Sequence, residues 1–316
     1  MSAGKRIPGT PDPMHRWPLE SGVTVAGDSW GEQSGPLVLL QHGGGQTRHA
    51  WKNAGEALGA AGYYAIALDA RGHGDSDWAD DGIYNQDVMV EDLRLLTRLL
   101  DKTRPVLVGA SMGGGTSLVA IGEGRIDATA LVLVDIAPRI EPEGVKKIGD
   151  FMRHRPDGYD SLEDVAAAIG DYQPHRQPPK DLAGLAKNLR LDANGKYRWH
   201  WDPRFLVGPR DLQKRGERLE QCAKTLTLPV LLVRGGLSDV LSTEGAAAFI
   251  ESCPHAEYVN ITGAGHMVAG DRNDVFGTAV VNFLTRAVPI GEDPAHAPRQ
   301  IEPHNERSPG GINDIP

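Results

Sequence analysis

The amino-acid sequence predicts an α/β protein with a mostly parallel central sheet, flanking helices and a mainly helical cap inserted between sheet strands. Short continuous apolar runs alternate with stretches of helical periodicity, which is typical of parallel strands joined by crossover helices. The alternation stops near residue 138 and resumes near residue 217. The intervening segment, 139–216, has many prolines, charges and aromatics but no clear strand, so we expect it to form the cap.

The elements can be assigned along the chain from these patterns. Buried strands, which read as continuous apolar runs, are expected at 37–41, 64–68, 106–108, 131–135, 230–233 and 257–261. Helices are expected around 51–58, 89–100, 117–121, 243–252 and 276–287. Residues 23–25 alternate and indicate an edge strand.

The two ends of the chain lack such patterns. Residues 1–18 hold four prolines, which indicates a loosely held arm. Residues 290–316 are rich in proline and polar groups and predict a C-terminal tail, disordered in character. The core would then comprise residues 19–138 and 217–289.

The bulk composition excludes several classes of protein. The 316 residues are 40% hydrophobic and 24% charged, with a formal net charge of −9, which argues against a nucleic-acid surface. Cys222 and Cys253 are the only cysteines, too few for a disulfide framework. No apolar run resembles a signal peptide or a membrane span. We expect a cytoplasmic monomer or homo-oligomer that acts on a small molecule, without membrane or nucleic-acid partners.

The stretch that organises the chain is a strand, a sharp turn and a helix around Gly109-Ala110-Ser111-Met112-Gly113. This Gly-x-Ser-x-Gly pattern in that context is typical of a nucleophile elbow, which lifts the serine side chain clear of the backbone. Only small residues fit two positions before and after the serine. Ser111 is therefore the candidate nucleophile.

A serine hydroxyl needs a base to take its proton, and the base needs an acid to orient it. His266, in the loop after the expected strand at 257–261, is the candidate base. Asp239, in the loop after the strand at 230–233, is the candidate acid, because the order Ser, Asp, His is typical of this elbow. Asp135 also ends a sheet strand and is the alternative acid. We prefer to interpret it as a structural residue that accepts hydrogen bonds from nearby backbone amides.

The oxyanion of such a reaction needs two backbone N–H donors fixed in advance. One is expected from Met112, directly after the nucleophile. The other is expected from the glycines after the strand at 37–41, where we choose Gly44 over Gly43 and Gly45. We expect His42 to bond loop carbonyls, and Asp69, Arg71 and His73 to brace the next loop rather than to act in catalysis.

These motifs together resemble the α/β-hydrolase superfamily, over roughly residues 20–138 and 217–287, and within it the cap-bearing esterases, lactonases and cofactor-free haloperoxidases. The resemblance implies the α/β-hydrolase fold and a serine hydrolase that cleaves a carboxylic ester or lactone through an acyl-enzyme, without a cofactor. Epoxide hydrolases and haloalkane dehalogenases carry aspartate where Ser111 stands, which argues against both reactions. The alternatives are perhydrolase or haloperoxidase chemistry, carbon–carbon bond hydrolysis, or a non-catalytic ligand-binding protein of this fold.

The expected cap has one conspicuous stretch of aromatics around Trp199, His200 and Trp201. These three residues are candidates for substrate binding, although aromatics that merely attach the cap to the core would look the same. No group of His, Asp or Glu has metal-ligand spacing, so no metal site is predicted.

Overall fold

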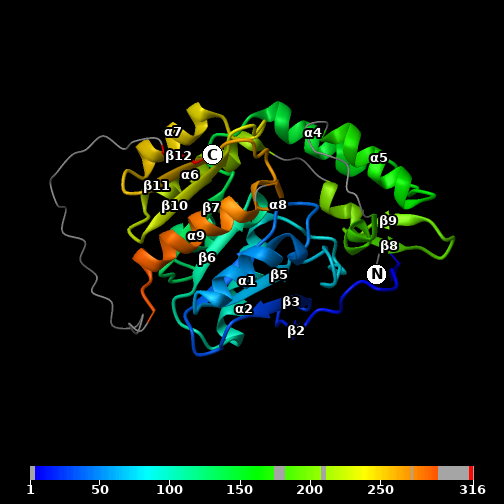
Figure 1. Cartoon of the computed structure of the whole chain (residues 1–316), viewed down its shortest axis with the longest axis horizontal. Coiled ribbons are helices and arrows are strands. Elements are labelled where there is room, and N and C mark those ends of the chain that lie inside the picture. The colour runs from blue at the N-terminus through cyan, green and yellow to red at the C-terminus, as the bar shows by residue number, and fades with distance from the viewer. Residues whose placement is uncertain (1–3, 174–181, 208–210, 272, 291–312, 316) are drawn as a thin grey trace.

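The computed structural model of the chain describes residues 4–173, 182–207, 211–271, 273–290 and 313–315. Its centre is a nine-stranded sheet with the order β12-β11-β10-β7-β6-β4-β5-β3-β2 (Figure 1). The strands are β2 (His15–Pro18), β3 (Thr24–Trp30), β4 (Leu37–Gln41), β5 (Tyr64–Asp69), β6 (Val106–Ala110), β7 (Ala130–Val134), β10 (Val230–Gly235), β11 (Glu257–Ile261) and β12 (Asn313–Ile315). From β5 to β12 every neighbouring pair is parallel, and β3 and β2 complete the sheet in antiparallel pairing.

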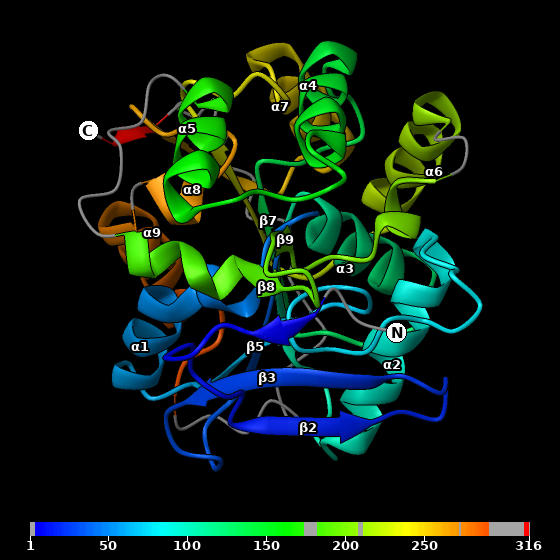
Figure 2. The same ribbon diagram turned by 90° about the vertical axis from the view of Figure 1, so that its right-hand side faces the viewer.

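Helices cover both faces of this sheet (Figure 2). One face packs against α1 (Lys52–Ala60) and α9 (Asn273–Ala287), with Leu58 and Phe283 in its buried core. The other face packs against α2 (Gln86–Leu99), α3 (Met112–Gly122), α6 (Leu212–Lys224) and α7 (Thr243–Ser252). The strands between them are buried on both sides, which explains why they read as continuous apolar runs. The predicted α/β-hydrolase fold is confirmed.

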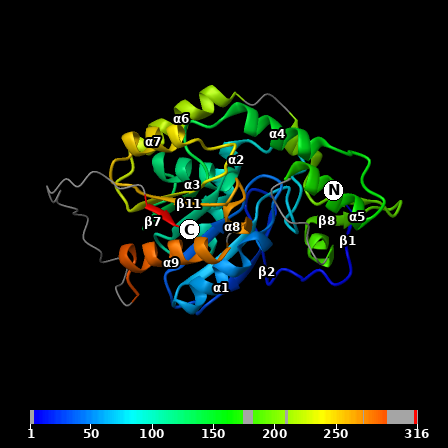
Figure 3. The ribbon, with the colours of Figure 1, turned by 45° about the horizontal axis from the view of Figure 1, so that its top comes forward.

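The segment that follows β7, up to the start of α6, adds no strand to the main sheet and lies beyond one end of it (Figure 3). We call residues 139–216 the insertion. It contains α4 (Pro142–Arg153), α5 (Leu162–Tyr172), η2 (Leu182–Asn188), β8 (Leu189–Leu191), β9 (Tyr197–Trp199), η3 (Pro203–Leu206) and the start of α6. The expectation that it lacks strands is wrong, because β8 and β9 pair as an antiparallel hairpin. Three-residue strands are too short to leave an alternating pattern in the sequence.

The N-terminal arm is also more ordered than expected. β1 (Lys5–Arg6) pairs with β8 of the insertion, and β2 pairs with β3 as the outer strand of the main sheet. The strand predicted near residues 23–25 is therefore β3, and it is not an edge strand. Most of the expected tail lies outside the described residues, although β12 within it pairs with β11.

Candidate active site

Ser111 stands at a sharp turn between β6 and α3. Its φ of 46° and ψ of −105° are strained for a residue with a side chain. Ser111 precedes the first helical residue, yet its side chain makes no capping hydrogen bond, so the hydroxyl is not used by the helix. A Cβ on Gly109 would come within 2.4 Å of the Gly113 carbonyl carbon, and one on Gly113 within 2.5 Å of the Gln41 oxygen. The turn therefore requires glycine at both positions, as the motif predicts.

The partner of His266 is Asp135, not the expected Asp239. The Nδ1 of His266 donates to Asp135 Oδ2 at 2.7 Å. The same carboxylate is fully buried and accepts from the Gly235 amide at 2.8 Å and from the Ser238 hydroxyl. These bonds fix the carboxylate, and the carboxylate in turn fixes the orientation of the imidazole, which lines the same cavity as Ser111.

Asp239 lies in the loop after β10, but its side chain is 48% exposed and pairs with Lys147 of α4 at 3.0 Å. The reason lies in the register of the sheet. Val134 at the end of β7 is level with Val233 in β10, so Asp135 arises directly at the carboxyl edge. Asp239 follows the end of β10 by four residues, in a loop that turns toward α4. The structure thus favours the alternative acid.

The glycine loop after β4 has two of its three amides occupied. The Gly43 amide donates to Gln46 Oε1 at 2.8 Å, and the Gly45 amide donates to His73 Nε2 at 3.2 Å. Among the described residues, the amides of Gly44 and Met112 have no hydrogen-bond acceptor. For Met112 this follows from its place at the start of α3, where helix amides lack an acceptor within the helix.

The peptide plane that carries the Gly44 amide is held rigidly. Its carbonyl, that of Gly43, accepts from His42 Nδ1 at 2.8 Å and from the Gln46 amide at 3.1 Å. His42 Nε2 accepts from the Ala70 amide at 2.9 Å, which fixes the neutral tautomer of the ring. Burial lowers the pKa of His42, so the ring stays neutral. His42 therefore bonds a loop carbonyl, as predicted.

His200 does not line the cavity as expected but supports the same loop from the insertion. It is 1% exposed, and its Nδ1 accepts from the Gly74 amide at 2.7 Å. Its Nε2 donates to the Gly45 carbonyl at 3.3 Å. Burial, followed by the neighbouring His73, lowers the pKa of His200 well below its usual value. The buried histidine thus connects the insertion to the glycine loop.

The loop after β5 is braced as predicted, but through a residue that the motif analysis missed. Arg48 is fully buried and contacts Asp69 at 2.6 Å, Asp75 at 2.8 Å and Asp28 at 2.9 Å. Burial alone would raise the pKa of Asp69, but Arg48 and backbone amides hold it below its usual value. Arg71 pairs separately with Asp92. Nothing in the sequence marks Arg48 as buried, because its position in a short 3-10 helix has no periodicity to reveal it.

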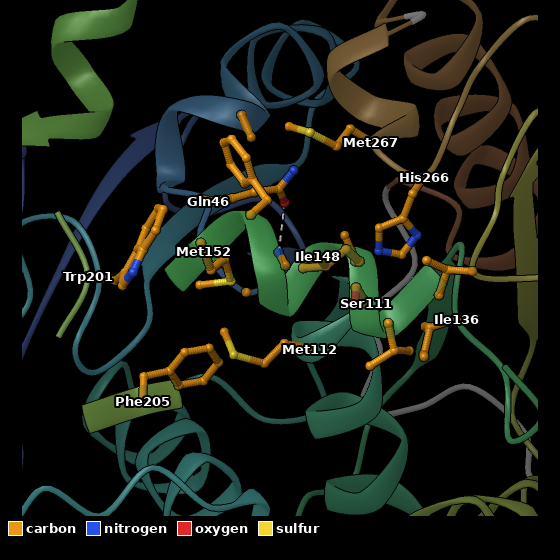
Figure 4. A pocket seen from close by; sticks show the side chains of 18 of the residues that line it. Gln46, Ser111, Met112, Ile136, Ile148, Met152, Trp201, Phe205, His266 and Met267 are labelled. Carbon is orange, nitrogen blue, oxygen red and sulfur yellow. Dashed lines mark hydrogen bonds between the residues drawn. The ribbon is translucent and has the colours of Figure 1, made fainter. Parts of the chain in front are cut away.

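Ser111 and His266 project into a cavity of about 1080 Å³ between the sheet and the insertion (Figure 4). This volume is slightly above the usual range of about 300–1,000 Å³ for small-molecule sites. Much of the lining is apolar. Trp199 and Trp201 line the cavity and stack on each other, with their ring centroids 5.0 Å apart. Phe151 and Tyr172 also line it and stack, with ring centroids 4.3 Å apart. Burial, with the charge of Asp239, raises the pKa of Tyr172 to about 12, so its hydroxyl stays neutral.

The sheet order, the elbow and the Asp135–His266 pair define the protein as an α/β-hydrolase. The sequence profile of the family described as "Serine aminopeptidase, S33" matches residues 32–273, so the chain belongs to this family of hydrolases.

No described helix has both the length and the apolar character needed to cross a bilayer.

Individual relatives agree with this assignment. The chain is 30% identical over 253 residues to Esterase Rv0045c of Mycobacterium tuberculosis, covering 77% of this chain and 80% of the relative. It is 26% identical over 255 residues to the 3-hydroxybutyrate-oligomer hydrolase of Cupriavidus necator, covering 77% and 86%. Its structure resembles that of E-2-(acetamidomethylene)succinate hydrolase, with a TM-score of 0.73, 25% identity and coverage of 85% and 98%.

Proposed function

We propose that the protein is a serine hydrolase that cleaves a carboxylic ester or lactone through an acyl-enzyme, with Ser111, His266 and Asp135 as its catalytic triad. The observation that supports this most directly is the 2.7 Å bond between Asp135 and His266, beside a strained serine at the same cavity. The names of the esterase and the oligomer hydrolase among its relatives point to the same class of substrate.

In the proposed reaction, His266 Nε2 takes the proton of the Ser111 hydroxyl while Oγ attacks the substrate carbonyl. The electron pair of the C=O bond moves to the oxygen, which the amides of Gly44 and Met112 stabilise. Collapse of this intermediate expels the alcohol, which receives the proton from His266. Water, deprotonated by the same imidazole, then releases the acid and restores Ser111.

In this proposal the insertion acts as a cap over Ser111. Trp199 and Trp201 supply an apolar wall for the substrate, while His200 holds the glycine loop. The volume of the cavity favours substrates larger than an acetate ester.

Hydrolysis of p-nitrophenyl esters, from acetate to decanoate, tests the proposal. We expect the wild type to turn over esters with a chain-length optimum beyond acetate, and Ser111→Ala to be inactive. Equal rates for wild type and Ser111→Ala would refute the serine mechanism. An inert wild type whose Ser111 still reacts with a fluorophosphonate would instead refute the substrate class.

A further inference from the structure

One wall of the cavity, around the glycine loop, is polar. Gln46, Thr47 and His49 line it from the core side, and Lys187 and Asn188 line it from the insertion. Thr47 Oγ1 donates to Asn188 Oδ1 at 3.2 Å, which joins the two halves. We call these five residues the polar wall.

The polar wall begins beside the nucleophile. Gln46 Oε1 accepts from the Gly43 amide, and a Cβ on Gly43 would lie 3.4 Å from Ser111 Cβ (Figure 4). The polar wall therefore includes a residue next to the proposed oxyanion loop, Gln46, and a charged residue of the insertion, Lys187, in the same cavity.

Two donors on this wall have no acceptor in the part of the chain that the structure describes. They are the Nε2 group of Gln46 and the ammonium group of Lys187. The Lys187 charge acts within the wall, since it is among the influences that lower the pKa of His49 to about 4, after burial and the charge of Arg48. His49 is neutral at neutral pH as a result, and Lys187 is the charged group of the wall.

Among the residues that the structure describes, no carboxylate that lines the cavity pairs with Lys187. Arg204 pairs with Asp202 at 2.7 Å, and Arg218 pairs with Asp87 at 2.6 Å. Lys214 and Arg215 of α6 also line the cavity and add positive charge to it, away from the polar wall. Asp211 is the one lining carboxylate among the described residues, and it caps the start of α6. Lys187, which forms no ion pair with any described residue, therefore makes the polar wall locally positive in a chain with a net charge of −9, and a positive surface in a cavity attracts anions.

We propose that the natural substrate carries a second carboxylate, in addition to the ester, which binds Lys187 and the Gln46 amide on the polar wall. This inference rests on the proposed function and specifies the substrate class of the same site. A carboxylate matches both donors at once, since it accepts hydrogen bonds and carries the opposite charge. The apolar walls would contact the hydrocarbon part of the substrate.

Two pairs of esters test this proposal. Mono-(4-nitrophenyl) adipate and 4-nitrophenyl hexanoate differ only at the far end of the acyl chain. The 4-carboxyphenyl and 4-carbamoylphenyl esters of hexanoic acid differ only in the leaving group. Spontaneous hydrolysis is subtracted in each case. We expect the anionic member of at least one pair to be preferred about tenfold in kcat/KM, mainly through KM.

The variants Lys187→Gln and Lys187→Arg then assign the preference. Lys187→Gln should reduce it to about twofold or less, Lys187→Arg should retain most of it, and added salt should weaken it. Lys102→Gln is the matched control, because Lys102 bonds the Gln33 carbonyl and lies outside the cavity lining. The proposal is overturned if neither pair shows a preference, or if the preference survives in Lys187→Gln. Ser111-dependent hydrolysis of the neutral hexanoate ester tests the proposed function separately.

Discussion

Replacing Asp135 by asparagine should lower turnover by orders of magnitude while leaving the fold intact. The Asp135 carboxylate accepts three hydrogen bonds, from His266, the Gly235 amide and the Ser238 hydroxyl. An asparagine has one acceptor oxygen and one NH₂ donor in the same place. If the asparagine oxygen keeps the hydrogen bond from the Gly235 amide, its NH₂ group faces Nδ1 of His266 and donates to it.

That arrangement forces the wrong tautomer of His266. Nδ1 would then accept, and Nε2 would carry the proton and could not take one from Ser111. The opposite orientation of the amide would turn its NH₂ group against the buried Gly235 N–H, at a cost of about 1–3 kcal/mol. We therefore expect kcat to fall by about 10³- to 10⁴-fold, as for an equivalent change in other triads.

Asp239→Asn is the matched comparison, because Asp239 was the acid expected from the sequence. It removes an ion pair whose two side chains are 50% and 48% exposed, which is worth less than about 1 kcal/mol. We expect turnover within about twofold of wild type. Steady-state kinetics on one p-nitrophenyl ester, with circular dichroism of each variant, measures both effects. An active Asp135→Asn enzyme or an inactive, folded Asp239→Asn enzyme would refute the assignment.

Three further predictions concern the loops around the site. The variant His200→Phe keeps an aromatic ring but loses the hydrogen bond to the Gly45 carbonyl. In steady-state kinetics it should therefore lower kcat more than it raises KM. An unchanged kcat would show that this hydrogen bond does not position the glycine loop. The variant Arg48→Met leaves the buried Asp69 carboxylate without its paired cation. The free energy of unfolding, measured by urea denaturation, should therefore fall by about 3–5 kcal/mol. A decrease of less than about 1 kcal/mol would contradict this prediction. His49 binds fewer protons in the folded state, because its pKa is lowered from 6.5 to about 4. The free energy of unfolding should therefore fall as pH drops through that window, and His49→Asn should flatten the dependence; an equally steep dependence in the variant would argue against His49 as its source.

Several strands and helices of the core could be predicted from the sequence, because their patterns are local. The bounds of β4, α7 and β11 coincide with the predicted ranges, since each is a short apolar run or a capped helix with clear limits. The turn around Ser111 could be predicted for the same reason, because its geometry demands glycine at two fixed positions.

The acid could not be predicted, because its identity depends on contacts between distant segments. Asp135 and Asp239 both follow sheet strands, and only the register of β7 against β10 brings Asp135 to the His266 loop. His200 presented the same difficulty. Its neighbours in sequence, Trp199 and Trp201, line the cavity, but its own ring turns to the backbone of Gly74 and Gly45.

The central claim is that Ser111 is a nucleophile activated by His266. Fluorophosphonate labelling followed by intact-mass and peptide mass spectrometry tests it most directly, because it requires no knowledge of the substrate. We predict a single adduct on Ser111 in the wild type, none in Ser111→Ala, and much slower labelling of His266→Ala. No adduct on the folded wild type, or an adduct on another residue that persists in Ser111→Ala, would contradict the account.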